Sequence, residues 1–260
     1  MLAGSAAITI YNIGGTFNSM LLSLSTSISN ILTTRITTMV AQSATDEELT
    51  SAFIKIGRIQ FIIVALIVSG FTVFGQSFIR LWMGERYVLA YWITVLTLFP
   101  LCIPMIQSIG ISIITAKNKH RFRSVVYCVI AVINVISTYF AIPKYGAVGA
   151  AFCSCVAYLL GQGLIMNIYY WKEIHIDIPL FWRNILKMSV LSIAMILVGL
   201  LITRHISINS WITFFSLVLV YSLIYFLLTY FINMNKYEKS LCRAIIRSLF
   251  KRVRKTDTIH

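Results

Sequence analysis

The most distinctive polar side chains of the sequence recur along its first apolar stretch. At about 100° per residue on a helix, they share an arc of about 80°, and apolar side chains hold the opposite side, which is expected to face lipid. The polar positions are Asn12, Thr16, Ser19, Ser23, Ser27, Asn30 and Thr34. The apolar positions are Ile13, Phe17, Met20, Leu21, Leu24, Ile28 and Ile31.

Hydroxyl and amide groups exchange hydrogen bonds and carry no charge at neutral pH. The polar stripe therefore favours a water-filled cavity or a path for sugar hydroxyl groups. Small hydroxyl residues also let two membrane helices pack closely, which is the structural alternative. We favour the cavity, because a stripe about six turns long exceeds what one helix contact needs.

The carboxyl and imidazole groups that could transfer protons or bind metals lie outside the apolar stretches. The eight Asp and Glu residues and the four His residues all fall in connections or in the tail. With no metal, nucleotide or nucleophile motif, the sequence predicts no catalytic residue, no metal site and no cofactor. The third apolar stretch carries Pro100 and Pro104 before Gln107, which predicts either a hinge or a static bend.

The composition places these groups in a membrane. Of 260 residues, 58% are hydrophobic and only 12% are charged, about half the charged share of a soluble domain. This excludes a soluble enzyme and predicts an all-α polytopic membrane bundle, since a spanning helix needs about 20 apolar residues. The seven predicted spans are about 8–34, 59–79, 90–116, 125–142, 147–169, 185–203 and 211–231.

The basic residues give these spans an orientation. Alternate connections and the tail collect 18 of the 22 Lys and Arg residues, and the remaining connections hold only Arg80, Arg86, Lys144 and Arg204. Basic connections stay in the cytoplasm, so the C-terminus is predicted inside and the N-terminus of this chain outside. The basic, amphipathic tail at 235–260 predicts a helix on anionic lipids, and no nucleic-acid partner.

An outside N-terminus is unusual without an exporting element before it. Residues 1–10 carry no charged side chain and do not resemble a signal peptide. We therefore expect the chain to be the C-terminal part of a longer protein or a truncated product.

Four short motifs, taken in order, resemble one transporter family. The connection Ala116-Lys-Asn-Lys-His-Arg-Phe-Arg123 precedes a span that holds Asn134 and ends in Ile142-Pro-Lys-Tyr-Gly-Ala-Val-Gly-Ala-Ala151. Tyr11-Asn-Ile-Gly-Gly15 and Leu81-Trp-Met-Gly-Glu-Arg-Tyr87 add to the likeness. Together they resemble the polysaccharide-transporter branch, the Wzx-type flippases, of the multidrug/oligosaccharidyl-lipid/polysaccharide exporter superfamily. The chain would match only the C-terminal lobe of such a two-lobed transporter.

The resemblance implies a flippase for undecaprenyl-diphosphate-linked oligosaccharide repeat units in the bacterial inner membrane, serving capsule, O-antigen or exopolysaccharide synthesis. Expected partners are that lipid-linked oligosaccharide, anionic membrane lipids, a polysaccharide polymerase and glycosyltransferases. Arg35 and Arg58, near the cytoplasmic mouth, are candidates to contact the diphosphate, and ordinary snorkelling to the interface is the alternative. The substrate path would be lined by Asn12, Thr16, Ser19, Ser23, Ser27, Asn30 and Gln107.

Other functions stay open at this level. A lipid II flippase or a cation-coupled drug exporter would belong to the same superfamily. A membrane enzyme, such as a glycan polymerase or an acyltransferase, would need a large loop or an intramembrane catalytic residue, and the sequence has neither. A non-functional truncated product is a further alternative, because one lobe encloses no cavity between lobes unless a second copy of the chain supplies the other.

Overall fold

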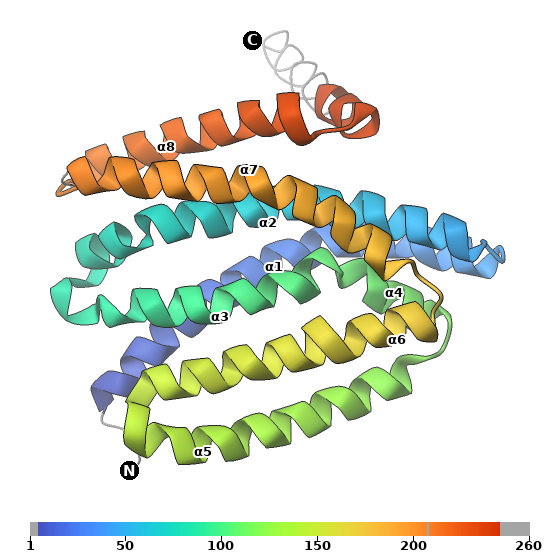
Figure 1. The fold of residues 1–260 in the computed structure, drawn as a ribbon, viewed down its shortest axis with the longest axis horizontal. Helices are drawn as coiled ribbons and strands as arrows, with labels where there is room; N and C mark the ends of the chain where they lie inside the picture. Colours follow the sequence, from blue (N-terminus) through green and yellow to red (C-terminus); the bar gives the residue numbers. More distant parts are fainter. Residues whose placement is uncertain (1–4, 207, 245–260) are drawn as a thin grey trace, which may run out of the picture.

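The chain folds into long helices, and the described residues contain no strand (Figure 1). The computed structural model describes residues 5–206 and 208–244; within the first helix, it does not describe the side chains of residues 5–8, 24, 25, 28–33 and 35. The elements are α1 (Ser5–Ala41), α2 (Asp46–Met83), η1 (Glu85–Tyr87), α3 (Leu89–Ile106), α4 (Ser108–Ala116), α5 (His120–Tyr158), η2 (Leu159–Ile165), α6 (Met166–Lys172), α7 (Ile178–His205), α8 (Trp211–Leu228) and η3 (Thr229–Asn233).

Five helical segments of the described chain are long and apolar enough to cross a membrane. The protein is therefore an all-α polytopic membrane bundle, which confirms the predicted fold class. One of the five contains two predicted spans, and α1, which carries the polar stripe, is not among them, so the count of seven stays a prediction. The five segments are α2, Glu85–Ile106, His120–Lys172, α7 and Trp211–Asn233.

The 53-residue segment His120–Lys172 doubles back on itself at Gly146. Gly146 has φ 56° and ψ −141°, a backbone conformation that glycine adopts without strain. The ring of Phe122 stacks on that of Tyr169 at 4.2 Å, so the far ends of the two arms lie side by side. Figure 1 shows the arms running in opposite directions, which confirms the turn predicted between residues 142 and 147.

The helices form a layered stack. In Figure 1, α7 and α8 lie above α2, α3 lies below it, and the two arms of His120–Lys172 lie at the bottom. The central helix α2 begins at a capping box, in which the Glu48 amide donates to Thr45 Oγ1 at 3.2 Å and the Thr45 amide donates to Glu48 Oε2 at 2.9 Å. Two otherwise unpaired amides at the helix start are thereby satisfied.

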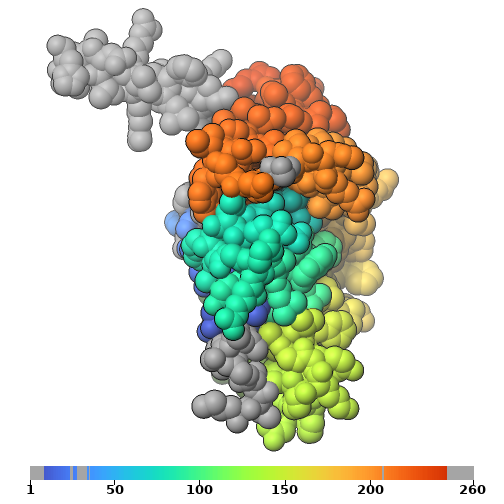
Figure 2. Space-filling view, turned by 90° about the vertical axis from the view of Figure 1, so that its left-hand side faces the viewer, coloured from blue at the N-terminus to red at the C-terminus, as the bar shows by residue number. Residues whose placement is uncertain are grey.

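Alternate connections lie at opposite ends of this stack. Figure 2 views one end, with the turn at Gly146 below, the α2–α3 connection in the middle and the α7–α8 connection above. At the other end, Lys117 Nζ lies 3.1 Å from Asp46 Oδ1 and Lys119 Nζ lies 3.8 Å from Glu173 Oε2. The α1–α2, α4–α5 and α6–α7 connections therefore meet there, and this end carries most of the basic connections. That it faces the cytoplasm stays a prediction.

A buried cluster near this basic end joins α2 to α3 and α7. The rings of Phe53 and Phe181 pack edge to face with centroids 4.9 Å apart. Gly57 lies against the Phe181 ring, and a Cβ added at residue 57 would come within 2.5 Å of Phe181 Cε2 and 2.9 Å of the Ile106 carbonyl oxygen. The missing side chain at residue 57 thus lets three helices approach closely.

Candidate substrate cavity and the polar face of α1

A cavity of about 690 Å³ lies between α1, α3, α4, α5 and η2, within the usual range for ligand pockets of roughly 300–1,000 Å³. Its lining on α1 runs from Tyr11 to Thr26, which corresponds to about 22 Å of helix rise. The cavity is therefore elongated along the bundle. Its polar lining residues are Tyr11, Asn18, Ser19, Thr26, Thr97, Ser108, Arg123, Tyr127, Asn134, Ser154, Tyr158 and Gln162.

Amides and hydroxyls of the cavity pair with one another only in part. Asn18 Nδ2 donates to Thr97 Oγ1 at 2.8 Å, while Asn18 Oδ1 is buried with no partner. On the α5 side, Ser154 Oγ accepts a hydrogen bond from Asn134 Nδ2 at 3.4 Å and lies 3.2 Å from the Tyr11 hydroxyl. The lining therefore keeps hydrogen-bonding capacity for water or a ligand bearing hydroxyl groups.

The predicted polar stripe divides between this cavity and the outer surface. Among the candidate residues on α1 whose side chains the structure describes, Ser19 lines the cavity, together with the adjoining residues Asn18 and Thr26. The side chain of Asn30 lies outside the described residues. The other stripe members are exposed and do not line the cavity: Asn12, Thr16, Ser23, Ser27 and Thr34.

The exposed hydroxyls of the stripe donate to their own helix. Thr16 Oγ1 donates to the Asn12 carbonyl at 3.0 Å, and Ser27 Oγ donates to the Ser23 carbonyl at 2.8 Å. The amide side chain of Asn12 has no such partner within the described part of the chain. Because an unpaired amide facing hydrocarbon costs several kcal/mol, this face of α1 suits water or another polar protein surface better than lipid.

The expectation that the apolar side of α1 faces lipid is wrong for Ile13 and Leu21, whereas Met20 on the same side is exposed. Ile13 is buried against Ile79 and Tyr91, and Leu21 is buried against Val64 and Leu98. In a bilayer an apolar helix face gains van der Waals contacts when it packs on other helices. On α1, Ile13 and Leu21 therefore face α2 and α3, while Asn18 and Ser19 lie toward the cavity.

Gln107 lies beside the cavity rather than in its lining. It interrupts the predicted third span, because α3 ends at Ile106 and α4 begins at Ser108, while the helix continues through both prolines. Its side chain is buried, and Nε2 donates to Asn167 Oδ1 at 2.7 Å. Trp182 Nε1 donates to the same oxygen at 2.9 Å. Gln107 thus ties α3 to α6, and its role in a substrate path stays a prediction.

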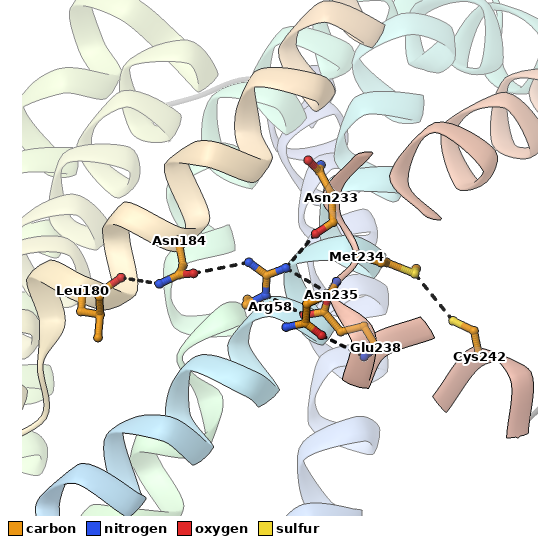
Figure 3. Close-up of polar contacts among 8 residues, drawn as sticks. All are labelled: Arg58, Leu180, Asn184, Asn233, Met234, Asn235, Glu238 and Cys242. Atoms are coloured by element: carbon orange, nitrogen blue, oxygen red, sulfur yellow. Dashed lines mark hydrogen bonds and ion pairs between the residues drawn. The ribbon is translucent and has the colours of Figure 1, made fainter. Parts of the chain in front are cut away.

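Arg58 is held by an acidic partner in the C-terminal segment (Figure 3). Its Nε donates to Glu238 Oε1 at 2.6 Å, and its Nη2 donates to Glu238 Oε2 at 3.0 Å and to the Asn233 carbonyl at 2.8 Å. Residue Arg58 is 9% exposed and Glu238 is 3% exposed. The positive charge of Arg58, which was predicted to contact a diphosphate, is thus neutralised within the protein. The side chain of Arg35, the other candidate, lies outside the described residues.

The start of the predicted surface tail is docked on the bundle. Residues 236–244 are helical, and the Glu238 amide donates to Asn235 Oδ1 at 3.0 Å, which caps the helix start. Cys242 and Met234 lie beside each other, with their sulfur atoms 3.8 Å apart (Figure 3). Burial, and in second place the charge of Glu238, raises the pKa of the Cys242 thiol. Residues 245–260 lie outside the described part.

Sequence reasoning did not select Arg123 as a site residue. In the sequence, Arg123 is one of the basic residues of the connection before the fourth predicted span. In the structure, it lies in the first turns of α5 and lines the cavity. The spacing of Arg123, Tyr127, Ile130 and Asn134 places them on one helix face, and all four line the cavity. This helical spacing of Arg123 with Tyr127 and Asn134 is the sequence signal that could have identified it as a site residue.

No family model matches the chain, and no curated protein or solved structure is significantly similar to it.

Proposed function

We propose that the protein is a membrane transporter of the flippase type, which moves a lipid-linked oligosaccharide between the leaflets of a bacterial inner membrane. The observation that carries the proposal is the uncharged polar face of α1 next to a cavity in which amides and hydroxyls stand among apolar side chains such as Leu22, Leu101 and Ile130. Elsewhere the bundle exposes large apolar side chains, such as Val190 and Leu197 on α7 and Phe215 on α8.

This division of surfaces matches what such a substrate needs. A sugar head group loses hydrogen bonds to water when it enters a membrane, and protein amides and hydroxyls can replace them. Uncharged groups such as Asn18 and Ser19 hold hydroxyls without the strong attraction that would prevent release. The polyprenyl tail can stay in the hydrocarbon beside the apolar outer faces of α7 and α8.

In the proposed orientation, the end where Lys117 meets Asp46 and Lys119 meets Glu173 faces the cytoplasm. The positive-inside rule supports this assignment, because the connections at this end and the tail contain most of the basic residues. The substrate would enter from this end and leave near the turn at Gly146. The C-terminus would accordingly be cytoplasmic.

The double substitution Ser19→Leu plus Ser23→Leu is expected to reduce glycan export about tenfold, since two lost hydrogen bonds of about 0.5–1.5 kcal/mol each raise the barrier by that factor. Ser19 lines the cavity and Ser23 belongs to the exposed stripe. The measurement is surface polysaccharide in cells that carry the complete gene, normalised to the amount of the protein in the membrane.

Ser216→Leu supplies the control, because Ser216 is exposed on α8 and lies away from the cavity. It adds a similar apolar side chain and is expected to leave export unchanged. Unaltered export in the double variant, at a normal level of the protein, would contradict the proposed path.

A further inference from the structure

The cavity contains a single charged residue among the described residues that line it, and this residue is Arg123. Four other basic residues of the described chain have carboxylate partners: Arg58 with Glu238, Arg80 with Glu85, Lys117 with Asp46, and Lys119 with Glu173. Arg123 has no carboxylate partner within the described part of the chain. Its positive charge is therefore available to a ligand in the cavity.

The local geometry presents Arg123 as a hydrogen-bond donor. Its guanidinium carbon lies 4.7 Å from the centroid of the Tyr127 ring, and an aromatic ring attracts the flat face of a guanidinium while leaving its N–H edge accessible. The Nε atom is buried and has no hydrogen-bond partner. Because buried donors are rarely left unpaired in folded proteins, a ligand or a water molecule is expected at this position.

The position of Arg123 within the cavity indicates how a ligand would lie. Arg123 is in the first turns of α5, near the Lys117–Lys119 connection, whereas Asn134 is 11 residues further along the same helix, or about 16 Å away. Uncharged amides and hydroxyls line the part toward Asn134 and Ser154. A ligand that fits both ends carries an anionic group at one end and hydroxyl groups at the other.

We propose that Arg123 is the anion contact of this cavity and binds a phosphate or diphosphate group of a lipid-linked sugar. The guanidinium suits this group because its fork of N–H donors matches phosphate oxygens. The identity of the ligand as lipid-linked depends on the proposed function, but the anion contact does not. The assignment gives Arg123 the role first considered for Arg35 and Arg58.

Binding of undecaprenyl phosphate to the whole 260-residue chain in an uncharged detergent tests this proposal. Arg123→Gln is expected to weaken binding about tenfold or more, the usual effect of losing a charge-assisted hydrogen bond. Arg123→Lys keeps the charge without the fork and is expected to lose less affinity. Arg121→Gln is the matched control, because Arg121 is exposed on the same helix turn and does not line the cavity.

Two further probes separate the sources of the anion. Inorganic diphosphate is expected to compete for the site in the wild-type chain, and undecaprenol, which lacks the phosphate, is expected to bind weakly and equally to all variants. If Arg123→Gln and Arg121→Gln bind undecaprenyl phosphate alike, Arg123 only snorkels to the interface and the proposal fails. If Arg123 affects inorganic diphosphate alone, the lipid-linked ligand is wrong.

The outcome is independent of the export assay. A melting temperature equal to that of the wild type would show that the Arg123 variants are folded. Loss of phosphate binding in Arg123→Gln, together with normal glycan export in the Ser19→Leu plus Ser23→Leu variant, would support the anion contact and reject the proposed sugar path. Normal phosphate binding in Arg123→Gln, together with reduced glycan export in the Ser19→Leu plus Ser23→Leu variant, would reject the anion contact and support the proposed sugar path.

Discussion

Glu238→Ala is expected to destabilise the protein by about 3–5 kcal/mol, because it leaves the Arg58 guanidinium buried without its counter-charge. The carboxylate contacts Arg58 at 2.6 Å and 3.0 Å, and its side chain is 3% exposed. The contact joins α2 to a segment 180 residues away in sequence. Unfolding in an uncharged detergent titrated with sodium dodecyl sulfate measures the change.

Glu85→Ala is the matched control for this prediction. Arg80 Nε also lies 2.6 Å from Glu85 Oε1, but the two side chains are 45% and 72% exposed. Exposed ion pairs contribute about 0–1 kcal/mol, so the control is expected to unfold almost like the wild type. Equal stabilities of the Glu238→Ala and Glu85→Ala variants would show that burial adds nothing to the Arg58 contact.

Alkylation of Cys242 reports whether residues 236–244 stay docked. In the wild type, partial burial shields this thiol, and its raised pKa keeps it in the less reactive thiol form. Arg58→Ala is the informative variant. It removes the ion pair that holds residues 236–244 against α2, and it retains the negative charge of Glu238. This variant is expected to raise the rate at which Cys242 is alkylated. The rate is measured by mass spectrometry on the proteolytic peptide that contains Cys242, after alkylation of the intact protein.

Gly57→Ala is expected to destabilise the protein by about 1–3 kcal/mol through overpacking. The new Cβ would lie 2.5 Å from Phe181 Cε2 and 2.9 Å from the Ile106 carbonyl oxygen. Phe181 is fully buried against Phe53, and the carbonyl belongs to helix backbone, so neither neighbour can move without disturbing its own packing. The same detergent titration gives the size of the loss.

Gly70→Ala on the same helix separates packing from helix propensity. Apart from its chain neighbours and the backbone of its own helix, no atom lies within 4 Å of a Cβ added at residue 70. Alanine is favoured over glycine inside a helix by about 1 kcal/mol, so this variant is expected to match or exceed the wild type in stability. Similar losses at both positions would mean that contact with Phe181 and Ile106 is not the cause.

The sequence was sufficient for the features that depend on local chemistry. Long apolar runs predict helices of membrane-spanning length, and the short gap between the predicted spans 125–142 and 147–169 predicts the turn between two arms. Both signals are local in the sequence, because hydropathy and backbone preferences act on residues that are neighbours along the chain. The structure has helices over these runs and a reversal at Gly146.

Features that depend on which surfaces meet could not be predicted in the same way. The two-sided pattern of α1 shows that Ile13 and Asn12 point in different directions, but apolar side chains in a bilayer are stable against lipid and against helices alike. The pattern alone therefore did not decide that Ile13 faces α2 and α3. The pairing of Arg58 with Glu238 was equally invisible, because no local spacing links them.

The reversal at Gly146 gives residues 120–172 the form of a helical hairpin. Each arm satisfies its own backbone hydrogen bonds, and Lys144 is the single basic residue in the connection. Two such arms can enter a bilayer together with only one charged side chain to be carried across. During synthesis the hairpin would therefore act as one insertion unit, and the position of Lys144 would decide how readily it inserts.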